Sequence, residues 1–141
     1  EVGVDMEARG IELGYFNYVD EDIVVIADAE QMKRVINNII SNSVKYLDKK
    51  KGIINIRIKD VGDFIQVEIE DNGKGIAAKD LPSIFDRFYR TDVSRNSSKG
   101  GSGIGLSIVK AIMDSFHQQC GVINHEDGVE FWFELEKGKQ S

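Results

Sequence analysis

The sequence predicts an α+β sandwich, in which a mixed, mostly antiparallel sheet of about five strands packs on three helices. Residues 52–60 and 64–71 alternate apolar and polar side chains, as an antiparallel hairpin with one buried and one wet face does. Residues 29–47 carry apolar side chains at three- and four-residue spacing, which indicates an amphipathic helix. Near the end of the chain, residues 129–136 alternate again after a turn at "HEDG". Because the strands read as hairpins, the sheet is expected to be mostly antiparallel.

The start of the chain is expected to lead into the long helix. Residues 1–10 are polar and unpatterned and are expected to be frayed or the end of an upstream linker. Residues 11–19 and 22–28 are expected to be two short strands joined by the acidic turn "DED". Asp28 stands directly before the helical pattern of residues 29–47 and is expected to cap that helix.

After the hairpin, the sequence predicts a loop, two more helices and a last pair of strands. "DNGKGI" at 71–76 interrupts the second strand of the hairpin, and a short helix is expected over residues 82–90. Residues 91–103 are nearly free of apolar side chains and are expected to be mobile, because they cannot pack in a core. Helical spacing resumes over 104–116, and residues 120–124 form the strand before the final turn.

Length, charge and cysteine content limit the class of protein. The 141 residues are expected to form one domain, residues 1–141. The net charge of −6 argues against non-specific binding to nucleic acid or to an anionic membrane, but not against a nucleotide held by local charges. No apolar run is long enough to span a bilayer. Cys120 is the single cysteine, which excludes an internal disulfide and fits a reducing compartment, so a cytoplasmic location is expected.

The long helix carries a second stripe that is polar. Asn38, Asn42, Lys45 and Tyr46 follow one another at i, i+4, i+7 and i+8, so they share a helix face that is separate from the apolar one. One face is therefore expected to pack in the core, while the other presents two amides, an ammonium group and a phenol together.

Two glycine clusters resemble nucleotide-binding loops. "GKGIAA" at 73–78 fits the dinucleotide fingerprint in spacing, but it follows a hairpin strand and no helical pattern starts directly after it. A P-loop is excluded because Leu106-Ser107 stands where Lys-Ser or Lys-Thr is needed. A plain turn or linker remains open for either cluster alone. Both clusters occur with the polar stripe, however, and alternating glycines before a helix let backbone N–H groups converge on an anion.

Four motifs in order resemble the ATP-binding catalytic domain of sensor histidine kinases. "NIISNSVKY" resembles the N box, "DNGKGI" the first glycine box, "FDRF" the F box and "GGSGIGL" the second glycine box. The resemblance runs from Ile11 to Glu136 and extends to the superfamily of type II topoisomerases, mismatch-repair ATPases and heat-shock chaperones. It implies that residues of about 74–103 form a mobile lid over ATP, anchored by Phe85 and Phe88.

The resemblance also assigns roles to single residues, with ATP and Mg²⁺ as ligands. Asn42 and Asn38 would bind Mg²⁺, Asp71 would select adenine through its exocyclic amine, and Asn38, Lys45 and Arg87 would be catalytic. The implied nucleotide-binding residues are Asn42, Lys45, Tyr46, Asp71, Gly73, Gly75, Ile76, Arg90, Lys99, Gly101, Ser102, Gly103, Ile104, Gly105 and Leu106.

Asn38 separates two activities within the superfamily. The members that hydrolyse ATP have a glutamate at this position to deprotonate water, and an amide cannot serve as that base. The resemblance therefore implies transfer of the γ-phosphoryl group of Mg·ATP to a histidine. A regulatory module that binds nucleotide without transfer, and an ATPase of the chaperone kind, are the alternatives.

The acceptor histidine is expected on a separate dimerisation domain. His117 at a helix end and His125 in a turn lack the helical context of an acceptor, and His117-Gln118-Gln119 departs from the His-Gly-Gly that is common in the family. The expected partners are that upstream domain and, indirectly, a response regulator. The isolated domain is expected to be monomeric and its parent a homodimer, whose attachment to a membrane the sequence leaves open; no contact of this domain with nucleic acid or membrane is expected.

Overall fold

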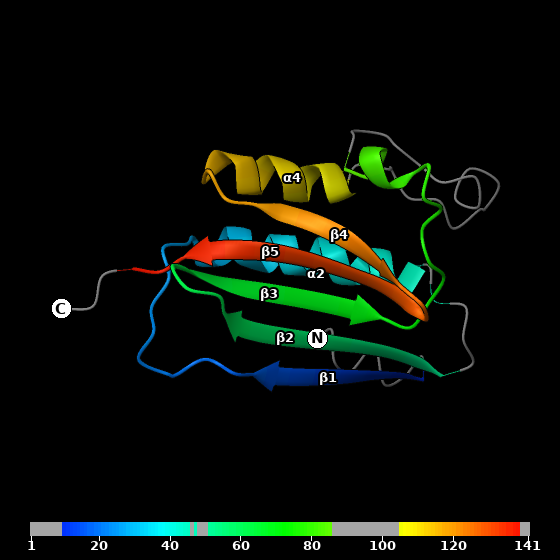
Figure 1. The fold of residues 1–141 in the computed structure, drawn as a ribbon, viewed down its shortest axis with the longest axis horizontal. Coiled ribbons are helices and arrows are strands. Elements are labelled where there is room, and N and C mark those ends of the chain that lie inside the picture. The colour runs from blue at the N-terminus through cyan, green and yellow to red at the C-terminus, as the bar shows by residue number, and fades with distance from the viewer. Residues whose placement is uncertain (1–9, 46, 48–50, 86–104, 139–141) are drawn as a thin grey trace.

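Five strands form one mixed sheet in the computed structural model, which describes residues 10–45, 47, 51–85 and 105–138. The strands lie in the order β1-β2-β3-β5-β4 (Figure 1). β1 pairs with β2 in parallel, and the other three pairings are antiparallel. The bounds are β1 Ile11–Asn17, β2 Gly52–Asp60, β3 Phe64–Asp71, β4 Cys120–His125 and β5 Gly128–Glu136. The predicted α+β class with a mostly antiparallel sheet is confirmed.

In the described part of the chain, two α-helices pack against this sheet, and both were predicted. α2 spans Ala29–Lys45 and α4 spans Gly105–Ser115, each slightly shorter than its apolar pattern. The third predicted helix, 82–90, begins as a 3₁₀ turn at Leu81–Ser83, and its residues 86–90 lie outside the described part of the chain. Within the described residues, no helix is both long enough and apolar enough to cross a membrane.

The start of α2 depends on Asp28, as expected. Its Oδ1 accepts hydrogen bonds from the backbone N–H groups of Glu30 at 2.9 Å and Gln31 at 3.2 Å. These two N–H groups have no acceptor inside the helix, so the carboxylate satisfies them. Its negative charge also interacts favourably with the positive end of the helix dipole. The predicted cap is confirmed.

The core lies between the two helices and the inner face of the sheet. Its most buried apolar side chains, each less than 2% exposed, are Val35, Ile39, Ile54, Ile69, Val109, Met113, Phe131 and Phe133. Both helices contribute to this one cluster, which holds α2 and α4 at set positions on the sheet.

The predicted strand at 22–28 is wrong. Only Val25 pairs there, in an isolated bridge to Lys137, supported by hydrogen bonds from Ile26 N to Glu136 O and from Gly138 N to Val24 O, both 2.8 Å. The segment runs around the end of the sheet, from the edge strand β1 to the helix α2 (Figure 1), and pairs there with the last residue of β5 and the two residues that follow it. The consecutive apolar side chains of Val24, Val25 and Ile26 are therefore exposed.

Candidate functional site

Three elements with predicted site residues end at the same side of the molecule. The C-terminal ends of α2 and β3 and the N-terminal end of α4 gather there (Figure 1). The second half of α2, the loop that follows Asp71 and the start of α4 therefore lie on one side of the molecule, although they are far apart in the sequence. β3 is antiparallel to both of its partners, which confirms that the glycine loop at 73–78 belongs to no parallel βαβ unit.

Asp71 ends β3 and is buried, with 6% of its surface exposed. Its Oδ1 accepts a hydrogen bond of 2.9 Å from the backbone N–H of Gly73, which turns the chain out of the strand. On the other side, a Cβ on Gly128 would lie 1.8 Å from the carbonyl oxygen of Asp71. Only glycine fits at position 128. The backbone of Asp71 therefore packs directly against the start of β5, while its side chain stabilises the turn at Gly73.

Two asparagines that the sequence analysis missed hold the loop after Asp71. Asn72 Oδ1 accepts from Ile53 N at 2.8 Å, and Asn72 Nδ2 donates to Lys51 O at 3.2 Å. Asn124 on β4 accepts from Ile76 N at 2.9 Å through Oδ1 and donates to Ile76 O through Nδ2. Asparagine is uncommon in strands, so its presence at position 124, within a predicted strand, was the sequence signal that could have indicated this role.

Gly75, between these anchors, is exposed and not crowded by the protein. A Cβ there would make only an ordinary contact of 3.5 Å with Asn124 Oδ1. The chain's own packing therefore does not require glycine at this position, which leaves the close approach of a ligand as a reason for it.

The polar stripe of α2 contains an orphaned donor. Asn38 and Asn42 are half-buried, and within the described residues the buried Nδ2 of Asn38 has no hydrogen-bond partner. An unpaired buried donor costs about 1–3 kcal/mol, so a ligand that fills it would be favoured. Two amides one helical turn apart offer oxygen ligands for Mg²⁺ and N–H donors for phosphate oxygens, so these residues fit the implied metal and nucleotide.

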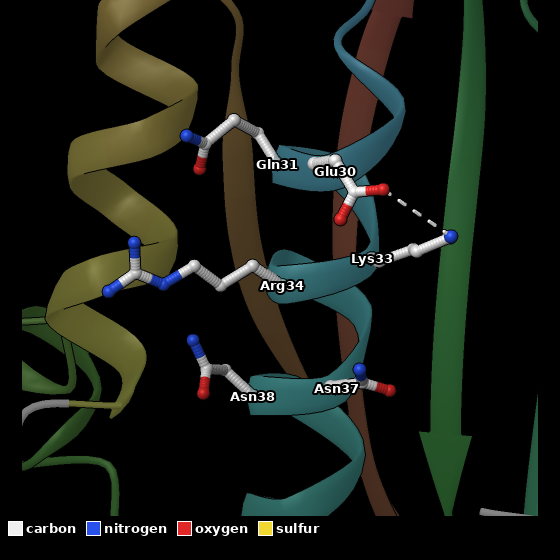
Figure 2. A pocket seen from close by; sticks show the side chains of 6 residues that line it. All are labelled: Glu30, Gln31, Lys33, Arg34, Asn37 and Asn38. Carbon is white, nitrogen blue, oxygen red and sulfur yellow. Dashed lines mark ion pairs between the residues drawn. The ribbon is translucent and has the colours of Figure 1, made fainter. Parts of the chain in front are cut away.

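A cavity of about 510 Å³ opens beside this stripe (Figure 2). It is lined by Glu30, Gln31, Lys33, Arg34, Asn37 and Asn38. Gln31, Arg34 and Asn38 point from α2 toward α4 (Figure 2). Lys33 points away from them and pairs with Glu30 at 3.6 Å.

The remaining predicted site residues divide between the described and the other parts of the chain. Gly105 is the first residue of α4, Leu106 is buried in the core, and Lys45 ends α2 half-buried. Phe85, an expected lid anchor, lies edge-on to Phe131 with ring centroids 6.4 Å apart. Eight site residues, together with Phe88 and residues 86–104 of the predicted lid, lie outside the described residues and stay predictions: Tyr46, Arg87, Arg90, Lys99, Gly101, Ser102, Gly103 and Ile104.

Comparison with known proteins identifies the family. Residues 27–139 match the family described as histidine kinase-, DNA gyrase B-, and HSP90-like ATPases. The chain belongs to this family. Within it, the chain is 37% identical over 125 residues to the sensor histidine kinase CusS of Escherichia coli K12, a match that covers 89% of this chain and 25% of CusS. The chain thus spans about a quarter of the length of that relative.

Solved structures of family members agree with this assignment. The catalytic domain of histidine kinase ThkA superposes with a TM-score of 0.80 at 26% identity, covering 94% of this chain and 84% of that one. A structure of ThkA in complex with the response regulator TrrA matches with a TM-score of 0.77 at 26% identity, covering 96% of this chain and 36% of that one. The chain is therefore an ATP-binding catalytic domain of the sensor histidine kinase type.

Proposed function

We propose that this domain binds Mg·ATP and transfers its γ-phosphoryl group to a histidine on a separate dimerisation domain of the parent protein. The observation that carries the proposal is the buried Asn38 donor, which has no partner among the described residues and lies on the polar face of α2. The C-terminal end of α2 lies on the same side of the molecule as the end of β3 (Figure 1), where the buried Asp71 carboxylate stands. The first group suits a phosphate and the second suits a base amine, and one nucleotide contains both.

The base is bound by the loop after β3. Asp71 Oδ1 already accepts from Gly73 N, and the other carboxylate oxygen accepts from the exocyclic amine of adenine. Gly73 and Gly75 let the ring approach the backbone, and Ile76, held by Asn124, packs beside it. This arrangement distinguishes adenine from guanine, because guanine has a carbonyl oxygen where adenine has the amine.

The phosphates are bound between α2 and the start of α4. Asn42 and Asn38 are the oxygen ligands for Mg²⁺, which when bound neutralises phosphate charge. Lys45 contacts phosphate oxygens as a point charge, and the first backbone N–H groups of α4 at Gly105 and Leu106 point toward the anion. Gly101, Gly103 and Arg87 of the predicted lid complete this set.

Transfer is favoured over hydrolysis by the residue at position 38. An asparagine cannot take a proton from water, so the domain positions the γ-phosphoryl group and neutralises its charge without activating a water molecule. The acceptor must then supply its own nucleophile, as a neutral imidazole nitrogen does.

Two measurements test the proposal. Calorimetry should show binding of Mg·ATP, and radiolabelled ATP should label a helical histidine domain of the parent but not this chain alone. Asp71→Asn keeps the acceptor for Gly73 N–H but changes the oxygen-only carboxylate into an amide, so ATP affinity should fall about 10–100-fold. Asp63→Asn, an exposed control, should bind normally.

The outcomes separate the alternatives. Unchanged affinity of Asp71→Asn would mean that the base does not lie at the loop after β3. Normal ATP affinity with no transfer to a competent histidine domain would favour a regulatory module, and steady phosphate release well above background would favour an ATPase.

We also propose the wider context of the domain. Residues 1–141 form a single, monomeric catalytic domain with a lid at about 74–103, within a homodimeric parent, and work in the cytoplasm. The downstream partner is a response regulator, which the ThkA–TrrA complex supports for a family member of the same fold. Size-exclusion chromatography of this chain and of a longer chain tests the two oligomeric states.

A further inference from the structure

The cavity beside Asn38 is lined by a positively charged side chain, Arg34, to which the proposed site assigns no role. Among the described residues, the structure shows no hydrogen bond or ion pair to the guanidinium group of Arg34, which is exposed. Its neighbour Lys33 differs, because it points away and pairs with Glu30 (Figure 2). Among the described lining residues, Arg34 therefore carries the net positive charge, since the carboxylate of Glu30 is already paired with Lys33.

Arg34 lies one helical turn before Asn38 on the same face of α2. Side chains at i and i+4 are neighbours, with about 5–6 Å between their Cβ atoms. Both side chains point toward α4 (Figure 2), so a ligand held by Asn38 lies within the reach of the guanidinium group. The side chain of arginine is long enough to reach from position 34 to a ligand at Asn38.

Two buried polar atoms of this cavity lack partners among the described residues. They are Asn38 Nδ2, a donor, and Gln31 Oε1, an acceptor one turn before Arg34. The donor beside Arg34 suits an anion, and the acceptor behind it can hold one guanidinium N–H while the others face that anion. Arg34 thus supplies a positive charge, Asn38 supplies a donor for the anion, and Gln31 can position the guanidinium group.

We propose that Arg34 binds the terminal phosphoryl group of the nucleotide. The inference rests on the proposed function, which places that group at Asn38. A planar guanidinium group pairs with two phosphate oxygens at once, and it neutralises the charge of the phosphoryl group during transfer. Arg34 then distinguishes ATP from ADP, because ADP has no phosphoryl group at this point.

Calorimetry with ATP, ADP and adenosine on Arg34→Gln, Arg34→Lys and the control Lys110→Gln tests the proposal. For Arg34→Gln, ATP affinity should fall about tenfold, as for the loss of one charged hydrogen bond, while ADP and adenosine affinities change less than about twofold. Arg34→Lys keeps the charge but not the bidentate geometry, so its ATP affinity should lie between those of Arg34→Gln and the wild type. Lys110→Gln, which removes an exposed ion pair with Asp114 and does not line the cavity, should bind all three ligands as the wild type does. Labelling of the helical histidine domain should slow on the order of 100-fold in Arg34→Gln.

Several outcomes would overturn the inference. Equal losses of ATP and ADP affinity would place Arg34 at an inner phosphate or in the fold. Unchanged ATP affinity with slower labelling would assign Arg34 to the acceptor domain. A wild-type chain that binds no nucleotide overturns the proposed function as well, whereas a wild type that binds both nucleotides, with Arg34→Gln unchanged, overturns this inference alone. Far-ultraviolet circular dichroism of each variant shows that it is folded.

Discussion

His117, in the turn that follows α4, has the left-handed backbone conformation, with a φ of 58°. Gln118 N donates to Met113 O at 2.9 Å across this residue, so the chain reverses here and then enters β4. Such a helix end usually has glycine, because a side chain in this conformation costs about 1–2 kcal/mol. The family's frequent glycines around this turn are absent, and the histidine carries the strain.

Replacing this residue by glycine should stabilise the protein. His117→Gly should raise the free energy of unfolding by about 0.5–1 kcal/mol, since the relief of strain exceeds the entropy that glycine loses on folding. Urea unfolding followed by circular dichroism measures the change. Gln119→Gly is the matched control and should lose stability, because no positive φ occurs there. Equal losses in both variants would contradict this account.

An ion-pair cluster on β2, β3 and β5 covers the outer face of the sheet. Arg57 contacts Glu68 at 3.0 Å, Glu70 at 2.5 Å and Glu130 at 3.4 Å. The hairpin was expected to have one wet face, but its Glu68 is only 6% exposed, as is Glu130 of the neighbouring strand β5. Strand register explains the difference, because it brings the long side chains of three strands together, and they cover one another.

The cluster sets the protonation of Glu68. Burial alone would raise the pKa of this carboxyl group, but hydrogen bonds from Arg57 and Lys59 and their charges hold the pKa below its ordinary value. A carboxyl group whose pKa is lower in the folded state stabilises the protein above its unfolded pKa. This contribution is lost as the pH falls through the folded pKa. The cluster therefore stabilises the sheet at neutral pH and stops doing so in acid.

Removing the guanidinium group should expose this dependence. Arg57→Met should lose about 1.5–3 kcal/mol at neutral pH, because Glu68 and Glu130 keep their burial and lose a charged partner. The loss should shrink as the pH falls below the ordinary carboxyl pKa, as urea unfolding at several pH values would show. Lys110→Met removes an exposed pair with Asp114 and should change stability by no more than about 0.5 kcal/mol. A loss for Arg57→Met that is independent of pH would show that packing, not charge, is responsible.

At the scale of the whole molecule, the site exists only when both helices pack on the sheet. Met113 of α4 is fully buried in the cluster that also contains Val35 and Ile39 of α2. The loop after β3, the stripe of α2 and the start of α4 are brought to one end of the molecule by this packing (Figure 1). Core stability and ligand binding are therefore coupled.

A cavity in this core should be compensated in part by the ligand. Met113→Ala should lower the free energy of unfolding by about 2–5 kcal/mol. Mg·ATP at about 100 times its dissociation constant should restore about 2.7 kcal/mol, because it binds only the folded state. Thermal unfolding with and without Mg·ATP measures both effects. Ile123→Ala, at a side chain 45% exposed, should stay within about 0.5 kcal/mol of the wild type; no ligand effect on either protein would argue against the coupling.

Sequence alone determined the features that depend on local periodicity. The hairpin bounds 52–60 and 64–71, the helix of the polar stripe and the cap at Asp28 all follow from spacings of two, three or four residues, and the structure has them. The four nucleotide-binding motifs could also be recognised from the sequence, because each is a short run of consecutive residues.

The tertiary structure decided what depends on contacts between distant residues. Residues 22–28 contain a short apolar run that is typical of a strand, but the chain leads them around the end of the sheet, where only Val25 forms a β-bridge among the described residues. Asn124 and Ile76 are 48 residues apart, and Arg57 and Glu130 are 73 residues apart, so no local pattern could pair them. Arg34 reads as one more charge on a solvated helix face, and only the three-dimensional structure shows that its side chain points toward α4, next to that of Asn38. Local spacing specifies which face a side chain takes, whereas strand register and helix packing specify what that face meets.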